Sequence, residues 1–329
     1  MNIRWMIATA ALFAVVGCKQ SADKAPAPEG QAATPPAAAK KLTVGFSQVG
    51  AESAWRTAET NSIRKEADKR GVDLKFSDAQ GKQAQQIQAL TSFIAQKVDA
   101  IVLAPVVETG WEVVLTQAKE ANIPVILVDR GIKTSDESLF TTLIASDFVA
   151  EGRMAGEWLA KKTSGKANIY ELQGSTGAAP AIDRKKGFEE VIAKNPDMKI
   201  IKSQSADFTR AKGKEVMEAF IKADREKIQA VYAHNDDMAL GAIQALEEAG
   251  MKPGETVTVI SVDGVKGAFE AMVAGKLDAS VECNPLLGPQ VFDTITQVKA
   301  GQKVPKFIQS KDQLFEKSQA AQVIGSREY

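Results

Sequence analysis

Several polar side chains in this sequence follow short apolar runs that are typical of buried β-strands. Glu52-Ser53-Ala54-Trp55-Arg56 comes after the first run, and Asp129-Arg130 comes after the fourth. Later in the chain, Asp183-Arg184 opens a predicted helix, His234-Asn235-Asp236-Asp237 follows a strand, and Asp263 ends another. In parallel sheets ligands bind beyond the carboxyl ends of the strands, so we expect these side chains to line a shared site.

Carboxylates, guanidinium groups, a side-chain amide and an indole together suit a neutral polyol. Asp accepts and Arg donates hydrogen bonds to adjacent hydroxyls, and an aromatic face packs on the C–H face of a sugar ring. An anionic ligand would favour arginines without carboxylate neighbours, whereas each Arg here has an Asp or Glu nearby in sequence. The set therefore favours a sugar site over an anion site.

Each of these residues also has a local explanation. Asp129-Arg130 alone would form an ion pair, Asp236-Asp237 would cap a helix, and Trp55 would belong to the core. His234 is the only histidine, so a metal cage or a Ser-His-Asp triad would depend on it alone. We therefore expect neither a metal site nor a catalytic residue. Because all these residues lie at the same end of the strands, we favour a shared binding site over separate local roles.

Enzyme motifs are missing from the sequence. It contains no Gly-x-Gly-x-x-Gly after a strand, no phosphate loop, no Gly-x-Ser-x-Gly and no His-Glu-x-x-His. Gly174-Ser175-Thr176-Gly177 precedes a helix and could hold an anion, but without a lysine it predicts only a glycine-rich rim of a cleft. The expected protein is not an enzyme and has no cofactor.

The elements that position these residues alternate between short β-branched runs and longer amphipathic stretches, as in parallel sheets with crossover helices. Strands are predicted at 42–48, 72–77, 100–104, 125–129 and 139–146, and again at 167–172, 198–203, 230–233, 257–262 and 279–282. Helices are predicted at 55–70, 83–96, 111–122, 182–194, 209–223, 236–249, 265–274 and 289–300.

The second half of this pattern repeats the first, since the strand at 100–104 resembles that at 230–233. The repeat predicts two similar doubly wound parallel-sheet α/β lobes, joined by three hinge strands near Ser146, Ser280 and Val304. The N-terminal lobe would hold residues 41–146 and about 281–304. The C-terminal lobe would hold residues 147–280 and about 305–329.

Composition is compatible with two α/β lobes and no polyanionic partner. The chain has 329 residues, of which 44% are hydrophobic and 25% charged. Lys plus Arg and Asp plus Glu both number 41, without a long run of one sign. We therefore expect no nucleic-acid partner.

The first forty residues have the pattern of an export signal and a tether. Arg4 precedes an apolar stretch at 7–16 that is too short to span a bilayer, and Val15-Val16-Gly17-Cys18 follows. Residues 1–18 thus predict a lipoprotein signal peptide whose lipobox places a lipid on Cys18, with an ordinary secretory peptide as the alternative. The Ala- and Pro-rich segment 19–40 predicts a tether. Cys283 then has no disulfide partner and is expected to be a small buried side chain.

Longer motifs resemble the ribose- and galactose-binding family of ABC sugar transporters, which has the type I periplasmic-binding fold. The motifs are Val44-Gly45-Phe46-Ser47-Gln48-Val49-Gly50, Glu52-Ser53-x-Trp55-Arg56, Ile182-Asp183-Arg184-Lys185-Lys186-Gly187-Phe188, Asp207-Phe208-Thr209-Arg210 and Tyr232-Ala233-His234-Asn235-Asp236-Asp237-Met238. The similarity runs from about Lys41 to Leu314, so the extreme C-terminus and the lipobox with its tether depart from it.

The resemblance implies a monosaccharide site between the lobes. Glu52, Ser53, Trp55, Arg56, Asp129 and Arg130 would contact the sugar from the first lobe, and Arg184, Asn235 and Asp263 from the second. Glu282, on a hinge strand, would be an additional contact, although the sequence around Cys283 departs from the family pattern.

The same resemblance implies a monomeric solute-binding protein in the periplasm or outside the cytoplasm, and the lipobox predicts that a lipid on Cys18 anchors it to a bacterial membrane. It would deliver galactofuranose or a related aldose to an ABC permease and its ATPase by closing like a clamp. The alternative is a sugar sensor for a chemoreceptor or histidine kinase. The residues alone do not distinguish a pentose from a hexose, or a furanose from a pyranose.

Overall fold

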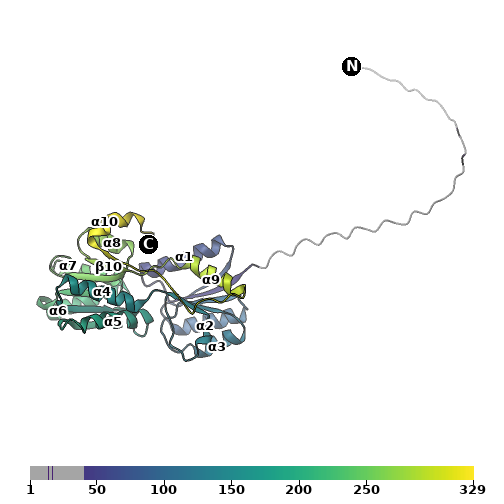
Figure 1. Ribbon diagram of the computed structural model, residues 1–329, viewed down its shortest axis with the longest axis horizontal. Helices are drawn as coiled ribbons and strands as arrows, with labels where there is room; N and C mark the ends of the chain where they lie inside the picture. The colour runs from purple at the N-terminus through teal and green to yellow at the C-terminus, as the bar shows by residue number, and fades with distance from the viewer. Residues whose placement is uncertain (1–13, 15–16, 18–40) are drawn as a thin grey trace, which may run out of the picture. The chain divides into compact units, whose positions relative to one another are not determined.

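The computed structural model describes residues 14, 17 and 41–329, of which Lys41–Tyr329 form one unit (Figure 1). The predicted lipidation site Cys18 and the predicted tether 19–40 lie outside the described residues. Two six-stranded sheets, each covered by helices, make up the unit.

The first sheet has the strand order β11-β5-β4-β3-β1-β2, and all its pairings are parallel. Its strands are β1 (Thr43–Gln48), β2 (Asp73–Asp78), β3 (Ala100–Leu103), β4 (Val125–Val128), β5 (Thr142–Ala145) and β11 (Phe307–Gln309). Its helices are α1 (Ala54–Lys69), α2 (Gln83–Ala95), α3 (Glu112–Glu120) and α9 (Gly288–Lys299), with a 3-10 turn η1 (Glu137–Leu139).

Alternating residues of this sheet fill two separate cores. Phe46 and Val102 face the cluster that contains Phe292 of α9. Ile101 and Leu103 face the opposite cluster, with helices α2 and α3. Because side chains alternate between faces along a strand, consecutive apolar residues in β3 are buried on both sides. Helices α1 and α9 lie side by side although they are far apart in sequence (Figure 1).

The second sheet repeats this arrangement, with the order β12-β10-β9-β8-β6-β7. Its strands are β6 (Lys166–Gln173), β7 (Asp197–Ser205), β8 (Ala230–Ala233), β9 (Thr258–Asp263), β10 (Ala279–Glu282) and β12 (Leu314–Glu316), of which only β12 runs antiparallel to its neighbour. Its helices are α4 (Phe148–Lys162), α5 (Ala179–Ile192), α6 (Arg210–Asp224), α7 (Asp236–Glu248), α8 (Lys266–Val273) and α10 (Lys317–Val323), with 3-10 turns η2 (Arg225–Lys227) and η3 (Ile324–Ser326).

The predicted fold class is confirmed: the chain is an α/β protein with two doubly wound, mostly parallel sheets. The order β5-β4-β3-β1-β2 in the first sheet matches β10-β9-β8-β6-β7 in the second, as the internal repeat implies. In such sheets a ligand crevice forms outside the strand ends where the winding direction reverses. Helices α4 and α10 and strands β11 and β12 were not among the predicted elements.

The chain crosses between the lobes three times, at positions that differ in part from the prediction. The first crossing follows Ala145, close to the predicted Ser146. The second lies at 283–287, after Ser280, because β10 is an integral strand of the second sheet. The third lies at 310–313, after Val304, because β11 pairs with β5. Residues 305–309 therefore belong with the first sheet, not with the second lobe as predicted, and the crossings lie outside the strands of both sheets.

Two glycines allow helices α4 and α5 to touch at their backbones. A Cβ atom on Gly152 would lie 2.1 Å from the carbonyl oxygen of Arg184, and one on Gly187 would lie 2.0 Å from that of Val149. Both distances are far below van der Waals contact, so any larger residue would push the helices apart. This close approach sets the position of Arg184, which is a predicted site residue.

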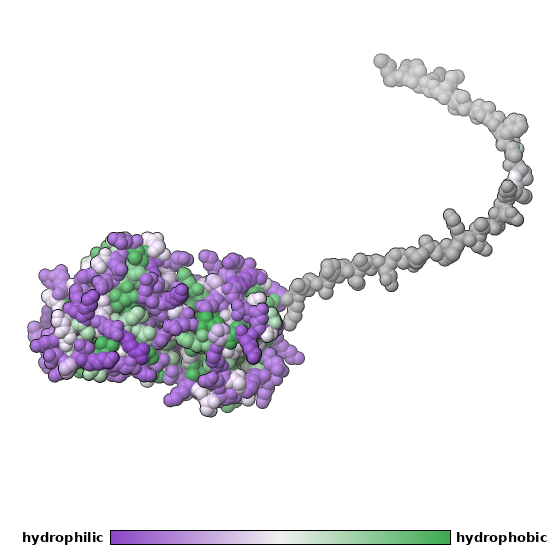
Figure 2. All heavy atoms as spheres, in the orientation of Figure 1, coloured by the Kyte–Doolittle hydropathy of each residue, from purple (hydrophilic) through white to green (hydrophobic). Residues whose placement is uncertain are grey.

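The visible surface of residues 41–329 is mainly hydrophilic, with apolar side chains in small patches (Figure 2). Among the described residues, every helix is too short or too polar to cross a membrane. The exposed large apolar side chains are scattered, as on the surfaces of most globular proteins.

We expect Gly152→Ala to destabilise the protein by about 1 to 3 kcal/mol, although alanine favours a helix more than glycine does, because the added methyl group overpacks the α4–α5 contact. Urea unfolding would measure this loss. Gly325→Ala is the matched control, since a Cβ there meets nothing within 4 Å. Equal stability of the two variants would contradict the packing argument.

Candidate sugar-binding site

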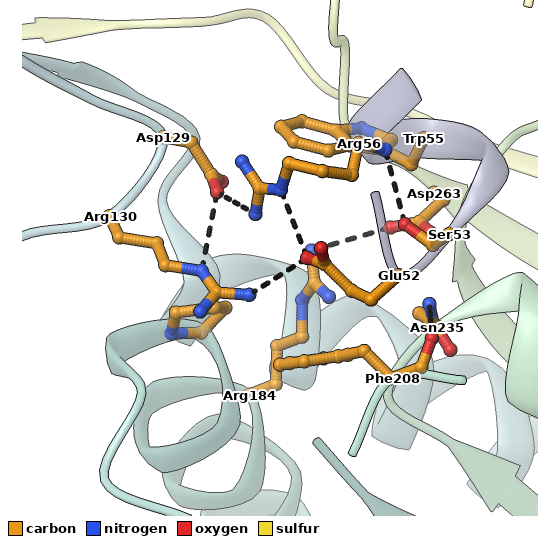
Figure 3. A pocket seen from close by; sticks show the side chains of 11 residues that line it. Glu52, Ser53, Trp55, Arg56, Asp129, Arg130, Arg184, Phe208, Asn235 and Asp263 are labelled. Carbon is orange, nitrogen blue, oxygen red and sulfur yellow. Dashed lines mark hydrogen bonds and ion pairs between the residues drawn. The ribbon is translucent and has the colours of Figure 1, made fainter. Parts of the chain in front are cut away.

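All nine predicted ligand-binding residues line one pocket between the two lobes (Figure 3). They come from the loops and helix starts that follow the strands of both sheets. Two further lining residues, Pro180 and Phe208, were not predicted as site residues. The complete lining consists of Glu52, Ser53, Trp55, Arg56, Asp129, Arg130, Pro180, Arg184, Phe208, Asn235 and Asp263.

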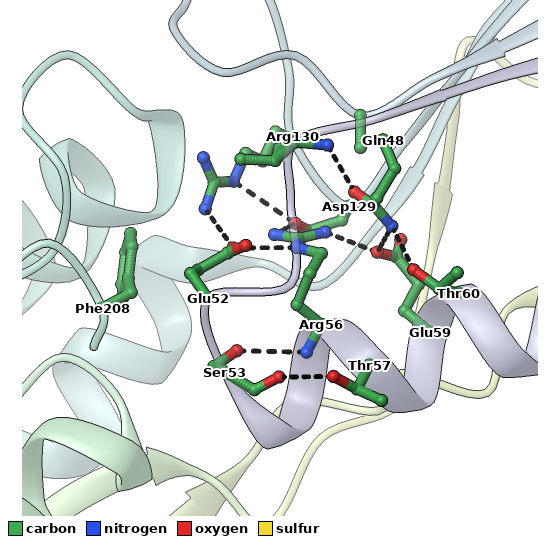
Figure 4. A network of polar contacts seen from close by, with 12 residues as sticks. Gln48, Glu52, Ser53, Arg56, Thr57, Glu59, Thr60, Asp129, Arg130 and Phe208 are labelled. Carbon is green, nitrogen blue, oxygen red and sulfur yellow. Dashed lines mark hydrogen bonds and ion pairs between the residues drawn. The ribbon is translucent and has the colours of Figure 1, made fainter. Parts of the chain in front are cut away.

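Arg56 is the centre of the polar network in the first lobe (Figure 4). Its Nε donates to Glu52 Oε1 at 3.0 Å, and its Nη2 donates to Asp129 Oδ2 at 2.6 Å. Its Nη1 donates to Oε2 of Glu59, a fully buried residue that sequence reasoning missed. The spacing of Glu59 three residues after Arg56 was the available signal, because such residues lie on the same face of a helix.

Two arginines and three carboxylates share this buried region of the first lobe. Burial raises the pKa of Glu52, but the charges of Arg56 and Arg130 more than offset it and the net pKa is lowered. Burial raises the pKa of Glu59 to about 7, although Arg56 acts in the opposite direction. The pKa of Arg130 is lowered by burial and by the charge of Arg56. With Glu59 protonated, the cluster is electrically neutral.

The second lobe holds Arg184 in a comparable way. Its Nε donates to Glu151 Oε2 at 2.7 Å and its Nη1 donates to the carbonyl oxygen of His234 at 2.6 Å, while Nη2 lies 3.7 Å from Asp263 Oδ1. Burial lowers the pKa of Arg184, but the Glu151 carboxylate outweighs it and the net pKa is raised. Burial raises the pKa of Asp263 well above its usual range, despite the charge of Arg184. Glu151, on the unpredicted helix α4, was also missed.

Trp55 and Asn235 already use their polar atoms within the protein. The Trp55 indole Nε1 donates to the carbonyl oxygen of Cys283, in the second crossing, at 2.6 Å. Asn235 Oδ1 caps helix α7 by accepting from Met238 N at 3.0 Å, and its Nδ2 donates to the carbonyl oxygen of Phe208 at 3.1 Å. Both side chains therefore have fixed orientations, and Trp55 presents its ring to the pocket.

Three lining residues have backbone conformations that non-glycine residues rarely adopt. The φ angle is +61° at Asp129, +60° at Phe208 and +132° at Asp263. Such conformations cost about 1 to 3 kcal/mol each and tend to collect at functional sites. Gly174 makes room for Phe208, since a Cβ on Gly174 would lie 1.9 Å from the Phe208 ring.

Some polar atoms at the pocket have no hydrogen-bond partner among the described residues. They include Glu52 Oε2, an acceptor, and Arg130 Nε, a donor that lies 3.5 Å from Asp129 Oδ2 as an ion pair without forming a hydrogen bond to it. Buried polar atoms are nearly always paired in folded proteins. An acceptor and a donor that lie together in this way suit a hydroxylated ligand.

The lobes touch each other around the pocket. Ala54 N, at the start of α1, donates to Asp237 Oδ2 of the second lobe at 2.7 Å. Glu108 N donates to the carbonyl oxygen of Gly177 at 3.0 Å, so the predicted glycine-rich loop does lie at the rim of the cleft. The Arg130 guanidinium stands 5.3 Å from the Phe208 ring centroid. In this structure the two lobes are therefore in direct contact at the pocket.

Three other candidates lie outside the pocket lining. Glu282 instead accepts hydrogen bonds from Arg327 Nη1 at 2.6 Å and from the Tyr329 hydroxyl at 3.0 Å. Cys283 is buried, as predicted, and forms no disulfide within the part of the chain that the structure describes. His234 is fully buried, and its Nε2 lies 3.1 Å from Glu171 Oε1. Within the described ranges, no group of three or more metal-ligating side chains comes together.

Known proteins resemble this chain over most of its length. Residues 44–303 match the periplasmic binding protein domain family. The galactofuranose-binding protein YtfQ of Escherichia coli (strain K12) is 55% identical over 82% of this chain and 86% of its own length.

Solved structures of sugar-binding proteins also resemble this chain over most of its length. The periplasmic binding protein component of the arabinose ABC transporter from Shewanella sp. ANA-3, bound to α- and β-L-arabinofuranose, is 54% identical with a TM-score of 0.85, over 87% of this chain and 96% of that one. A protein from Mycobacterium smegmatis in complex with β-D-fucofuranose is 50% identical with a TM-score of 0.85, over 88% and 95% of the two chains.

These matches confirm the predicted resemblance and the expectation of a binding protein rather than an enzyme. The two-sheet fold, the pocket between the lobes and the family match over residues 44–303 lead to one conclusion. This chain belongs to the periplasmic binding protein family.

Proposed function

We propose that this chain is the solute-binding component of an ABC sugar importer and that it captures a monosaccharide in its furanose form. The observation that carries the proposal is the charge balance of the pocket: the guanidinium groups of Arg56, Arg130 and Arg184 all lie within 3.5 Å of a carboxylate. An anion would have to displace one of these carboxylates, whereas a neutral polyol can bind between them.

The shape and polarity of the lining support a sugar. Carboxylate and guanidinium groups offer acceptors and donors to adjacent hydroxyls, and the rings of Trp55 and Phe208 offer apolar faces to the C–H groups. The nine predicted residues, which include Trp55, and Phe208 are therefore the proposed ligand contacts. Pro180 adds a rigid apolar surface at the start of α5.

The furanose preference is inferred from the relatives. Galactofuranose, L-arabinofuranose and β-D-fucofuranose appear in the names of proteins that are 50 to 55% identical to this chain. The protein would therefore select one ring form from an aldose solution in which furanose and pyranose forms interconvert.

Delivery by clamp closure is supported by the division of the pocket between two lobes. A ligand that contacts both lobes binds the closed arrangement preferentially and shifts the population toward it. An ABC permease could then distinguish loaded from empty protein. We further propose that a lipid on Cys18 holds the protein at a membrane outside the cytoplasm, through the Ala- and Pro-rich tether.

Sugar binding is tested by thermal shift with two locked pentoses. A pentose closes to a furanose through its 4-hydroxyl and to a pyranose through its 5-hydroxyl, so 5-deoxy-L-arabinose forms only the furanose and its 4-deoxy counterpart only the pyranose. Ligand at a hundred times its dissociation constant adds about 2.7 kcal/mol to the folded state. We expect the 5-deoxy sugar and L-arabinose to raise the melting temperature, whereas the 4-deoxy sugar does not.

In the same assay, Asp129→Ala and Arg184→Ala should each weaken binding by about 1.5 to 3 kcal/mol, the usual loss when a charge-assisted partner is removed. Arg153→Ala is the control, since Arg153 forms an exposed ion pair with Glu190 on the same lobe. Wild-type affinity in both pocket variants would move the ligand to another site.

Closure is tested by small-angle scattering of residues 41–329. The radius of gyration should fall when L-arabinose binds, and Asp237→Ala should close less completely because it removes the acceptor for Ala54 N. Glu255→Ala, which removes an exposed ion pair far from this contact in sequence, should close like the wild type. Tight sugar binding with unchanged scattering would contradict the clamp mechanism.

Membrane attachment is tested by Cys18→Ser in the producing bacterium. Because the tether precedes the folded unit, the variant should leave the membrane fraction while its sugar affinity stays at the wild-type value. Retention of the variant in the membrane fraction would show that the cysteine carries no anchor.

A further inference from the structure

The segment Arg327–Tyr329 packs beside the loop that follows Asp263, the last residue of β9. Lys266 N, in the first turn of helix α8, donates to the main-chain oxygen of Tyr329 at 2.6 Å. Only two residues separate Lys266 from Asp263, which lines the pocket. Figure 1 shows helices α8 and α10 side by side, with the C-terminus next to them. The end of this sequence therefore lies against the wall of the site.

Arg327 makes two directed contacts with this wall. Its Nη1 donates to Glu282 Oε1 at 2.6 Å, and its Nη2 donates to the carbonyl oxygen of Gly264 at 2.7 Å. The guanidinium also lies 5.0 Å from the Phe269 ring centroid and 4.5 Å from that of Tyr329. With 8% of its side chain exposed, Arg327 is held on several sides.

The Gly264 contact bears on the conformation of Asp263. The φ angle of +132° at Asp263 is one that side-chain-bearing residues rarely adopt, so neighbouring groups must hold it there. The Asp263 carbonyl oxygen accepts from Cys283 N at 3.1 Å, and Gly264 N donates to Ser280 Oγ at 3.1 Å. Arg327 supplies the next contact along the chain, at the Gly264 carbonyl.

The Glu282 contact connects the same loop to two of the three crossings between the lobes. Glu282 lies opposite Asp263 in the register of β10 and β9 and precedes the crossing at 283–287. Its Oε2 accepts from Gln313 Nε2 at 3.2 Å, and its main-chain N donates to the Gln313 carbonyl oxygen at 2.7 Å. Gln313 ends the third crossing, so Arg327 bridges the pocket loop and the hinge.

We propose that Arg327 is a positioning residue for ligand binding: through Gly264 and Glu282 it keeps Asp263 in its pocket-lining conformation and ties that loop to the crossings. This inference rests on the proposed sugar-binding function. It assigns a role in binding to a segment that does not itself line the pocket.

The first test measures L-arabinose affinity by calorimetry for Arg327→Ala and Arg327→Lys. Lysine keeps the charge but lacks the planar fork that reaches two acceptors, so we expect both variants to bind about tenfold more weakly. Arg327→Lys also provides a result if the alanine variant fails to fold. Glu328→Ala, at an exposed neighbouring position, should bind like the wild type. Wild-type affinity in a folded Arg327 variant would overturn the proposal.

A double-mutant cycle separates positioning from a general structural effect. If Arg327 acts through Asp263, then replacing Arg327 in an Asp263→Ala background should change affinity by less than about twofold, because coupled residues are not additive. The same tenfold loss in both backgrounds would mean that Arg327 acts independently of Asp263, and the proposal would be wrong.

A ligand-free measurement distinguishes failure of this proposal from failure of the proposed function. The backbone amide signals of Asp263 and Gly264 in the ¹H–¹⁵N spectrum of the sugar-free protein should move in Arg327→Lys and stay in place in Glu328→Ala. If the wild type binds no sugar, the sugar-binding function fails and with it the role of Arg327 in binding. If it binds L-arabinose and these signals do not move, only the positioning role fails.

Discussion

The burial of ionised groups between two lobes is the constraint on which the rest of this structure depends. Removing a guanidinium or carboxylate from water is costly unless a partner of opposite charge and suitable hydrogen bonds compensate for it. Arg56 meets this requirement with three carboxylates, and Arg184 with Glu151, the His234 carbonyl and Asp263. Apart from Glu59, which shares helix α1 with Arg56, the partners come from other elements, so the network fixes the positions of strand ends and helix starts together.

Close backbone packing provides that precision in the second lobe. Arg184 can reach Glu151 because α4 and α5 touch at Gly152 and Gly187. Helices α6 and α7 use the same device: a Cβ on Gly241 would lie 2.1 Å from the Arg210 carbonyl oxygen. Arg210 in turn pairs with Asp237, the acceptor at the interface between the lobes. A substitution at one of these close helix contacts would therefore also displace residues of the site.

Much of the site could be predicted from sequence because parallel strands release their following residues at one edge of the sheet. This rule brings together Asp129, Asn235 and Asp263 without any knowledge of the contacts. It does not find the residues that support the pocket from behind. Glu151 lies inside a helix, where a buried carboxylate has the same sequence pattern as an exposed one, and the only signal for Glu59 was its spacing from Arg56.

Other features depend on pairings between distant segments. Strand β12 has three residues and lies antiparallel to β10, and β11 joins the first sheet late in the sequence, so neither has a periodic pattern of its own. Phe208 was part of a recognised motif, yet its role in the lining depends on the absence of a side chain at Gly174, which only the fold reveals. The hinge positions were displaced for the same reason, since pairing decides to which sheet residues 305–309 belong.

The charge network also explains why a neutral ligand would control closure. Each ion pair around the pocket joins residues of the same lobe, so closing the clamp neither makes nor breaks one of them. The direct links between lobes described above are two hydrogen bonds and the contact of Arg130 with Phe208. Burial raises the pKa of Glu108, the charge of Asp183 on the other lobe raises it further, and the charge of Lys133 lowers it, so carboxylates of both lobes lie at the rim. Trp55 of the first lobe also packs in the hydrophobic cluster of the second. In the proposed clamp mechanism, a ligand that contacts both lobes would add to these contacts and favour the closed state further.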